Sequence, residues 1–390
     1  MFDFDQILLR SGTASEKWDG RERYFGRADV TPLWVADMDF AAPSAVTEAL
    51  VARAQHPVYG YTLADDAVYD SLIGWLARQY GWRVEREWIV LTPGVVPSLY
   101  AAVQAMTQPG QGVIVQPPVY APFFSAVTTH GRPLLENPLR LTHGRYEMDF
   151  EQLEQCAQQG AKLLLLCSPH NPVGRVWQPG ELDTVLDIAR RYQLAVLSDE
   201  IHADLIYPEY QHTPLAMQAS NNDALITAVA PSKTFNIPGL GLSALIIPDA
   251  GVRQSMVTAF ASLHVHSGNP FSMTAFTAAY QHGAAWRDAL MLYLRDTRDA
   301  VMCYLAAHIP AINVIQPEGT YLLWLDCREL GMHDAELQAF FVQQCQLGMN
   351  PGTVFGQGGS GFMRLNLASP RTVVLEALAR VAAKLNQATT

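Results

Sequence analysis

Lys233 stands where an amine could act as a nucleophile. It follows the apolar run 224–230 with only Pro231 and Ser232 between them. An amine beside such a run is poorly solvated, and desolvation lowers its pKa, so that more of it is neutral and able to form a Schiff base. The alternative interpretation is a lysine in a surface loop, and this segment alone does not decide between the two.

A carboxylate stands at the end of another apolar run. Asp199 follows the residues 194–197 after a single serine. Because a buried charge without a partner is costly, this side chain needs a cation or a donor beside it, and a protonated pyridine nitrogen would be such a partner. The alternative interpretation is a residue that caps the start of a helix.

Two turns could hold the polar groups of a ligand. Residues 91–96 form a strand-turn-helix junction, in which Gly94 lets the backbone approach a phosphate at the start of a helix. Residues 168–174 contain two prolines and a glycine, and this rigid loop presents the amide of Asn171. Taken alone, the first segment is more often an ordinary turn, and the second is as often a turn as a site.

The elements that must position these residues alternate along the chain. Helix-like segments at 95–106 and 181–192 lie between apolar runs, and the predicted strands are 88–91, 112–115, 163–167, 194–197, 224–230 and 242–247. Runs that are apolar throughout are typical of strands covered on both faces. The pattern predicts an α/β fold with a mostly parallel central sheet sandwiched by helices, and ligands bind beyond the carboxyl ends of such strands.

The pattern changes after about residue 280. Helical stretches at 286–308, 334–344 and from 372 onward alternate with strand-like segments at 321–325 and 362–367. We expect a smaller α+β domain here, completed by the first residues of the chain. The predicted division is a large domain at 46–280 and a small domain formed by 1–45 and 281–390, which suits a chain of 390 residues.

Composition limits the partners. The formal net charge of −11 argues against nucleic acid or an anionic membrane, because both need a basic face. No apolar run approaches the roughly 20 residues of a membrane helix, and the acidic start is unlike a signal peptide, so a soluble cytoplasmic protein is expected. The five cysteines are widely spaced without a C-x-x-C pair, which predicts neither disulfides nor a metal site.

The order and spacing of the segments are more specific than any one of them. Tyr120 follows a Pro-Pro pair, and S-P-x-N-P-x-G, S-D-E and S-K come after it in that order. This arrangement resembles the fold-type-I pyridoxal 5′-phosphate (PLP) enzymes related to aspartate aminotransferase, over nearly the whole chain. The resemblance implies PLP as the cofactor, an amino acid as the substrate, and a homodimer with shared active sites.

The resemblance also assigns roles. Lys233 would carry the cofactor as a Schiff base and then move the Cα proton, and Asp199 would pair with the pyridine nitrogen. Asn171 would donate to the phenolic oxygen of the ring, and Tyr120 would stack on the ring face. Arg364 would clamp the substrate carboxylate. The remaining candidates contact the phosphate, the cofactor or the substrate: Gly94, Val95, Val96, Ser232, His202, Ala36 and, from the partner subunit, Tyr61.

Three positions depart from the common aminotransferase pattern. His202 replaces the tyrosine usual three residues after the aspartate, Ala230 replaces a serine that often binds the phosphate, and Gly241 replaces an arginine. Two phosphate ligands are thereby lost. More of the phosphate binding would then depend on backbone amides and on Tyr61.

The reaction is narrowed by a second resemblance. Residues 34–40, 199–205 and 350–356 look like the MalY/PatB branch, the cystathionine β-lyases or C–S lyases. This implies α,β-elimination of L-cystathionine, cystine or an S-alkylcysteine to a thiol, pyruvate and ammonia. The alternatives are an aminotransferase, which uses the same residues, and a PLP-binding regulatory or interaction protein without catalysis.

Overall fold

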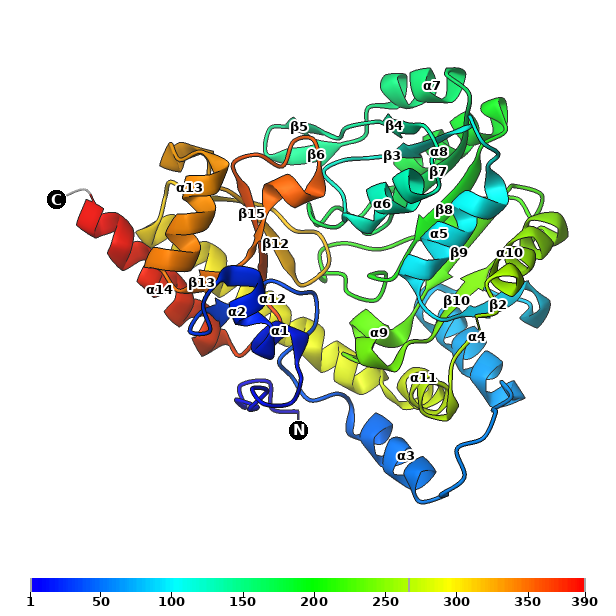
Figure 1. Cartoon of the computed structure of the whole chain (residues 1–390), viewed down its shortest axis with the longest axis horizontal. Coiled ribbons are helices and arrows are strands. Elements are labelled where there is room, and N and C mark those ends of the chain that lie inside the picture. The colour runs from blue at the N-terminus through cyan, green and yellow to red at the C-terminus, as the bar shows by residue number, and fades with distance from the viewer. Residues whose placement is uncertain (1, 266, 389–390) are drawn as a thin grey trace.

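The computed structural model describes residues 2–265 and 267–388. Its main element is a seven-stranded sheet with helices on both faces, seen at the right of Figure 1. In spatial order the strands are β2 (Ile89–Thr92), β10 (Ser243–Ile246), β9 (Leu225–Val229), β8 (Ala195–Asp199), β7 (Ala161–Cys167), β3 (Gly112–Val115) and β4 (Leu134–Glu136). Neighbouring strands are parallel except at β10, which is antiparallel to both β2 and β9.

The central strands are apolar throughout because each face is covered by helices. Leu163 and Leu165 of β7 pack toward one core, which includes side chains of α5, α6 and α10. Leu164 and Leu166 pack toward the other core, which includes side chains of α7 and α8. The helices that cover the two faces are α5 (Val95–Met106), α6 (Pro122–Thr129), α10 (Ala250–Ser262), α7 (Phe150–Gln158) and α8 (Pro179–Tyr192).

A second, antiparallel sheet lies toward the C-terminal part of the chain. Its strands are β11 (Asn313–Ile315), β12 (Leu322–Asp326), β15 (Phe362–Asn366) and β14 (Asn350–Pro351). The helices of this part are α12 (Ala284–His308), α13 (Asp334–Ala339) and α14 (Arg371–Ala388). The segment 334–344, predicted as one helix, is α-helical only to Ala339 and then continues as a π-helical segment, Phe340–Gln344.

The N-terminal segment lies against this smaller sheet region (Figure 1). Thr31 and Pro32 of β1 pair in parallel with β13 (Leu347–Gly348). The short helices α1 (Glu16–Asp19) and α2 (Arg21–Phe25) precede β1. The remaining elements are α3 (Ser44–Ala54), α4 (Asp66–Tyr80), α9 (Pro231–Thr234), α11 (Pro270–His282), β5 (Arg140–Thr142) and β6 (Arg145–Glu147).

One hydrophobic core joins the two sheet regions. It contains buried side chains from α4, α11, α12, α14 and β12, for example Trp75, Phe276, Leu294, Leu378 and Leu323. The helix α12 contacts both α11 and α14 (Figure 1). None of the helices in the described part of the chain is both long and apolar enough to cross a bilayer.

An ionic network ties the loop after β7 to the smaller sheet. Glu318, in the connection between β11 and β12, accepts hydrogen bonds from Arg175 Nε at 3.0 Å and from the backbone N–H of Val176 at 2.8 Å. Arg175 is 1% exposed and also contacts Glu181 at 2.8 Å. The backbone N–H groups of Glu318 and Gly319 both donate to the carbonyl of Gly174. The loop that carries Asn171 is therefore held by Glu318, which lies 143 residues after Arg175 in the sequence.

We expect Glu318→Ala to lower the free energy of unfolding by roughly 3–5 kcal/mol, because it leaves the buried guanidinium of Arg175 with one carboxylate instead of two. Urea denaturation followed by intrinsic fluorescence measures the change. The matched control is Glu329→Ala, whose carboxylate accepts an exposed hydrogen bond from Asn313. An unchanged urea midpoint for Glu318→Ala would show that this network does not stabilise the fold.

Candidate active site

The predicted site residues meet in one cavity of about 430 Å³ at the carboxyl edge of the large sheet. β8 ends at Asp199, β9 leads into α9 with Lys233, and β2 leads into α5. The predicted residues that line the cavity are Ala36, Gly94, Val95, Val96, Tyr120, Asn171, Asp199, His202, Ser232, Lys233 and Arg364. Tyr61 is fully exposed in the connection between α3 and α4 and does not line the cavity.

Lys233 is held by a backbone carbonyl. Its Nζ donates to the carbonyl oxygen of Ala36 at 2.7 Å. Burial and, to a smaller extent, the positive charge of Arg364 lower the pKa of this amine to about 8, against the opposing negative charges of Asp37 and Asp199. A large neutral fraction of the amine is therefore present near pH 8, as a Schiff-base lysine requires.

The segment that carries Ala36 is fixed from several sides. Tyr321 donates its hydroxyl to the same carbonyl oxygen at 2.8 Å. Asn236, three residues after Lys233, exchanges hydrogen bonds with the backbone of Met38 and donates to the carbonyl of Phe40. The position of the Lys233 amine thus depends on residues from α9, the N-terminal segment and the start of β12.

A second ionic network anchors the same segment. The carboxylate of Asp39, 4% exposed, accepts hydrogen bonds from Lys17 Nζ at 2.8 Å, Arg10 Nη1 at 2.7 Å and Trp18 Nε1 at 2.8 Å. Ser369 donates its hydroxyl to the same carboxylate at 2.8 Å. These bonds hold the residues around Ala36 against the C-terminal part of the chain.

Asp199 is buried and forms no ion pair with any residue that the structure describes. Among the described residues, the one hydrogen bond to its carboxylate comes from the backbone N–H of Ile201 at 3.1 Å. Burial raises the pKa of this carboxyl to about 7, although the N–H of Ile201 and the charge of Lys233 act in the opposite direction. A cationic N–H donor in the cavity would restore the ionised form and remove the cost of burying it.

Arg364, on β15, is a buried guanidinium with no carboxylate within the described part of the chain. It donates from Nη1 to Asn171 Oδ1 at 2.9 Å and from Nη2 to Asn350 Oδ1 at 2.8 Å and the carbonyl of Trp34 at 2.9 Å. Its Nε–H has no hydrogen-bond partner among the residues that the structure describes, and burial lowers its pKa to about 10. The remaining donors suit the carboxylate of a ligand.

His202 lines the cavity as a buried imidazole. Its ring is 3% exposed, and Nδ1 has no hydrogen-bond partner among the described residues. Burial lowers the pKa to about 3, helped by the charges of Lys233 and Arg364. The imidazole is therefore neutral at any ordinary pH and contributes no charge to the cavity.

These groups fit PLP. The helix α5 begins at the cavity with Gly94 at its N-cap and no side-chain cap, which leaves the N–H groups of Val95 and Val96 for a phosphate. The unpaired carboxylate of Asp199 suits the pyridine nitrogen. Asn171 uses Oδ1 for Arg364, and its Nδ2 makes no hydrogen bond within the described residues, which leaves it as a donor. No group of three or more His, Cys, Asp and Glu side chains in the described residues could hold a metal ion.

Several lining residues were not predicted from the sequence. Cys167, at the end of β7, lines the cavity, but burial raises its thiol pKa well above the usual value, which favours the neutral thiol over the nucleophilic thiolate. Glu16 and Asn350 also line it and come from segments far away in sequence. The segment 350–356 resembles the MalY/PatB branch, but no local pattern in the sequence predicts that Asn350 lies beside Arg364.

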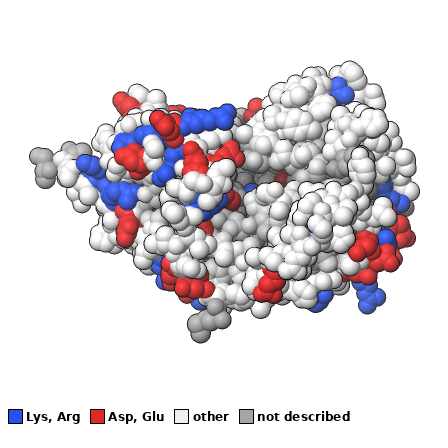
Figure 2. Space-filling model, turned by 60° about the horizontal axis from the view of Figure 1, so that its bottom comes forward, with Lys and Arg blue, Asp and Glu red and all other residues white. Residues whose placement is uncertain are grey.

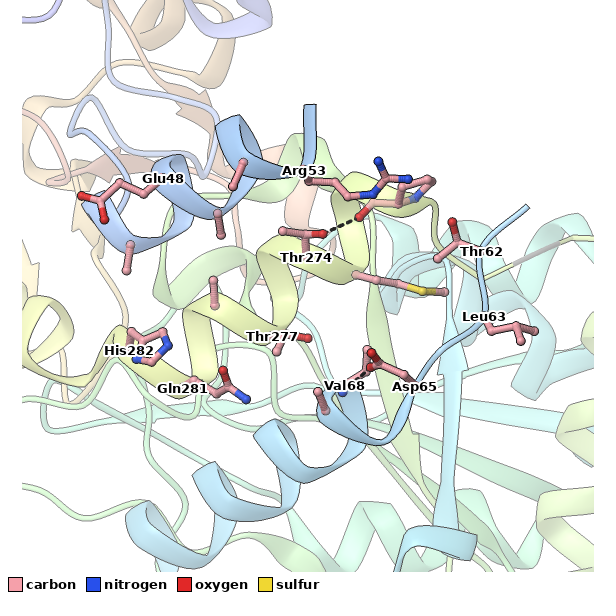
Figure 3. Close-up of a pocket in the computed structure, with 17 residues that line it drawn as sticks. Glu48, Arg53, Thr62, Leu63, Asp65, Val68, Thr274, Thr277, Gln281 and His282 are labelled. Carbon is pink, nitrogen blue, oxygen red and sulfur yellow. Dashed lines mark hydrogen bonds between the residues drawn. The ribbon is translucent and has the colours of Figure 1, made fainter. Parts of the chain in front are cut away.

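A larger hollow, of about 700 Å³, lies elsewhere, between α3, the start of α4 and α11. Figure 3 shows Thr274 and Thr277 of α11 between the α3 residues Glu48 and Arg53 and the loop residue Leu63. Much of its wall is formed by alanines, and no predicted site residue lies in it. We therefore assign the chemistry to the smaller cavity.

The comparisons with known proteins agree with this assignment. The model of the aminotransferase class I and II family matches residues 28–381. Cystathionine β-lyase PatB of Bacillus subtilis is 42% identical over 98% of this chain and all of its own length, and protein MalY of Escherichia coli is 34% identical over 95% of this chain and 96% of its own. The crystal structure of cystalysin from Treponema denticola, which contains PLP, has a TM-score of 0.94 at 36% identity and covers 99% of both chains.

The chain belongs to the aminotransferase class I and II family. Within it, the chain is a relative of PatB and MalY along nearly its whole length. The predicted resemblance and the predicted α/β fold with its mostly parallel sheet are therefore confirmed.

We expect the apoprotein to capture PLP covalently at a rate that rises with pH through a midpoint near 8, because the neutral amine of Lys233 is the reactive form. An ordinary lysine would place the midpoint near 10.5. Arg364→Leu removes a positive charge and should raise the midpoint, whereas Asp199→Asn removes a negative charge and should lower it. Absorbance of the bound cofactor at a series of pH values measures all three, and a common midpoint would contradict the electrostatic account.

Proposed function

We propose that the protein is a PLP-dependent carbon–sulfur lyase that converts L-cystathionine or a related sulfur amino acid to a thiol, pyruvate and ammonia. The observation that carries the proposal is the meeting of Lys233, Asp199 and Arg364 in one cavity, in a chain 42% identical to a cystathionine β-lyase. When bound, PLP supplies an electron sink that accepts the electron pair of the substrate Cα–H bond.

Each residue then has a defined part. Arg364 binds the substrate carboxylate and orients the Cα–H bond toward Lys233. The neutral amine of Lys233 takes the Cα proton, and the resulting ammonium can return a proton to the leaving sulfur. Asp199 keeps the proton of the pyridine nitrogen in place, and Tyr120 and Asn171 hold the ring. The Cβ–S bond breaks with its electron pair on sulfur, and the three-carbon fragment takes up water and loses ammonia.

The carbonyl of Ala36 has a part in this sequence. It accepts a hydrogen bond from the Lys233 amine at 2.7 Å, and the Tyr321 hydroxyl fixes it in place. An amine released from the cofactor would therefore return to a defined position instead of swinging through the cavity. The position of this amine decides which proton it can reach.

We further propose two lobes around this cavity and a second copy beside it. Residues 46–280 would form the large PLP-binding domain, and 1–45 with 281–390 the small domain, which the pairing of β1 with β13 supports. The loop before α4 exposes apolar side chains, among them Val58, Tyr59, Tyr61 and Leu63. A second copy of the chain would cover them and receive Tyr61 at its own phosphate site.

We expect sustained release of pyruvate from L-cystathionine by the purified holoenzyme with no keto acid added, because elimination regenerates the cofactor in every turnover. A coupled lactate dehydrogenase assay measures it, and Lys233→Ala is the control that should release none. A single equivalent of keto acid, with no further turnover, would instead identify an aminotransferase. Binding of PLP without reaction on any sulfur amino acid would favour a regulatory protein.

We expect two inactive variants to restore activity when their subunits are mixed. In a heterodimer of Lys233→Ala and Tyr61→Ala chains, one site combines the intact lysine of one copy with the intact tyrosine of the other. Pyruvate release after mixing measures the recovery, and mixing either variant with itself is the control. Absence of recovery, in a mixture shown to contain heterodimers, would place Tyr61 outside the partner's site.

A further inference from the structure

Glu16 is a charged residue of the cavity that the proposed chemistry does not use. Among the described residues, the charged side chains that line the cavity are Glu16, Asp199, Lys233 and Arg364. Asp199 and Arg364 are buried and Lys233 is partly buried, whereas Glu16 is exposed and lies on the solvent side of the cavity. It begins the short helix α1, far in sequence from the residues that bind the cofactor.

The Glu16 carboxylate is linked to Arg364 through two aromatic residues, Tyr24 and Trp34. Tyr24 donates its hydroxyl to Glu16 Oε1 at 2.6 Å, and the ring of Tyr24 lies 4.4 Å from that of Trp34 between centroids. Trp34 donates from Nε1 to the carbonyl of Lys17 at 3.2 Å and accepts from Arg364 through its own carbonyl. Trp34 therefore connects the part of the cavity at Glu16 with the part at Arg364.

The charge of Glu16 has no cationic partner in the described part of the chain. No ion pair with Glu16 occurs within residues 2–265 and 267–388, and the neighbouring Lys17 is turned inward to Asp39. Arg23 lies over the ring of Tyr24, 5.6 Å from its centroid. Figure 2 shows acidic and basic side chains intermingled at the left of the face in view.

The field of Glu16 extends into the cavity. The pKa of Tyr120 is raised by burial and, against the opposing charge of Arg364, by the negative charges of Asp199 and Glu16. Tyr120 lines the same cavity as Lys233. A ligand that extends from Arg364 past the ring of Tyr120 toward solvent would bring its far end near the carboxylate of Glu16.

We propose that Glu16 binds the distal ammonium group of the substrate and so selects sulfur amino acids that carry one. This rests on the proposed lyase function. In the proposed reaction, Arg364 binds the α-carboxylate of the substrate and Lys233 acts on its Cα–H bond. The part of the substrate beyond sulfur then extends toward the solvent side of the cavity, where Glu16 lies. L-Cystathionine and L-cystine carry a second amino group there, whereas S-alkylcysteines do not.

Three probes separate this proposal from general affinity for cysteine conjugates. S-Aminoethyl-L-cysteine carries a distal ammonium, S-propyl-L-cysteine is its neutral counterpart, and S-carboxyethyl-L-cysteine carries a distal carboxylate. We expect the wild-type holoenzyme to prefer the ammonium probe over the neutral one by about 2- to 5-fold, the range of a solvent-exposed ion pair. The carboxylate probe should be the weakest, and added salt should reduce the differences.

Variants of Glu16 test the assignment directly. Glu16→Gln should abolish the preference for the ammonium probe, and Glu16→Lys should reverse it in favour of the carboxylate probe. The effect should appear in KM with little change in kcat, because the distal group binds equally well before and during reaction. Glu22→Gln on α2, also acidic and exposed but outside the cavity, is the matched control and should behave as the wild type.

Two readouts keep this proposal separate from the proposed function. Dissociation constants come from the change in cofactor absorbance on binding each probe, and kcat/KM comes from pyruvate release. Absence of pyruvate from L-cystathionine and from all three probes would refute the lyase, while the dissociation constants would still test Glu16. Equal affinity of the wild type for the three probes, or an unchanged preference in Glu16→Gln, would overturn the distal ammonium site.

Discussion

Asp199, Lys233 and Arg364 carry ionisable groups in one cavity, and none of them has an ionic partner among the described residues. Burial shifts each pKa in the direction that favours the neutral form of the group. The shift reflects the free-energy cost of holding a charge away from water. A cofactor that brings a pyridine nitrogen and a carbonyl carbon, and a substrate that brings a carboxylate, would remove much of that cost. The same unpaired groups therefore explain both the affinity for ligands and the reactivity of the amine.

Two networks of buried ion pairs hold the surrounding structure in place. Glu318 and Arg175 fix the loop of Asn171, and Asp39 with Lys17 fixes the segment of Ala36. Both networks connect parts of the chain that are distant in sequence. They explain why a carbonyl and an amide can be placed to within hydrogen-bond distance of Lys233 and Arg364.

The buried strands of the large sheet were predictable because their apolar runs are continuous. The strand at Gly112–Val115 and the helix at Val95–Met106 lie where the pattern placed them. The antiparallel direction of β10 was not predictable, since a run buried on both faces looks the same in either direction. The change from α- to π-helix after Ala339 also left no signal in the spacing of apolar residues.

The sequence by itself determined the family and the fold. It also predicted that Lys233, Asp199 and Asn171 meet in one cavity, because each lies at or shortly after the carboxyl end of a strand of one sheet. It did not place Glu16, Asn350 or Tyr321, although each lies within reach of the same cavity or of the carbonyl that holds Lys233. These residues come from the N-terminal segment and the smaller sheet region. Their positions depend on how those parts pack against the large sheet, and long-range packing leaves no local pattern in a sequence.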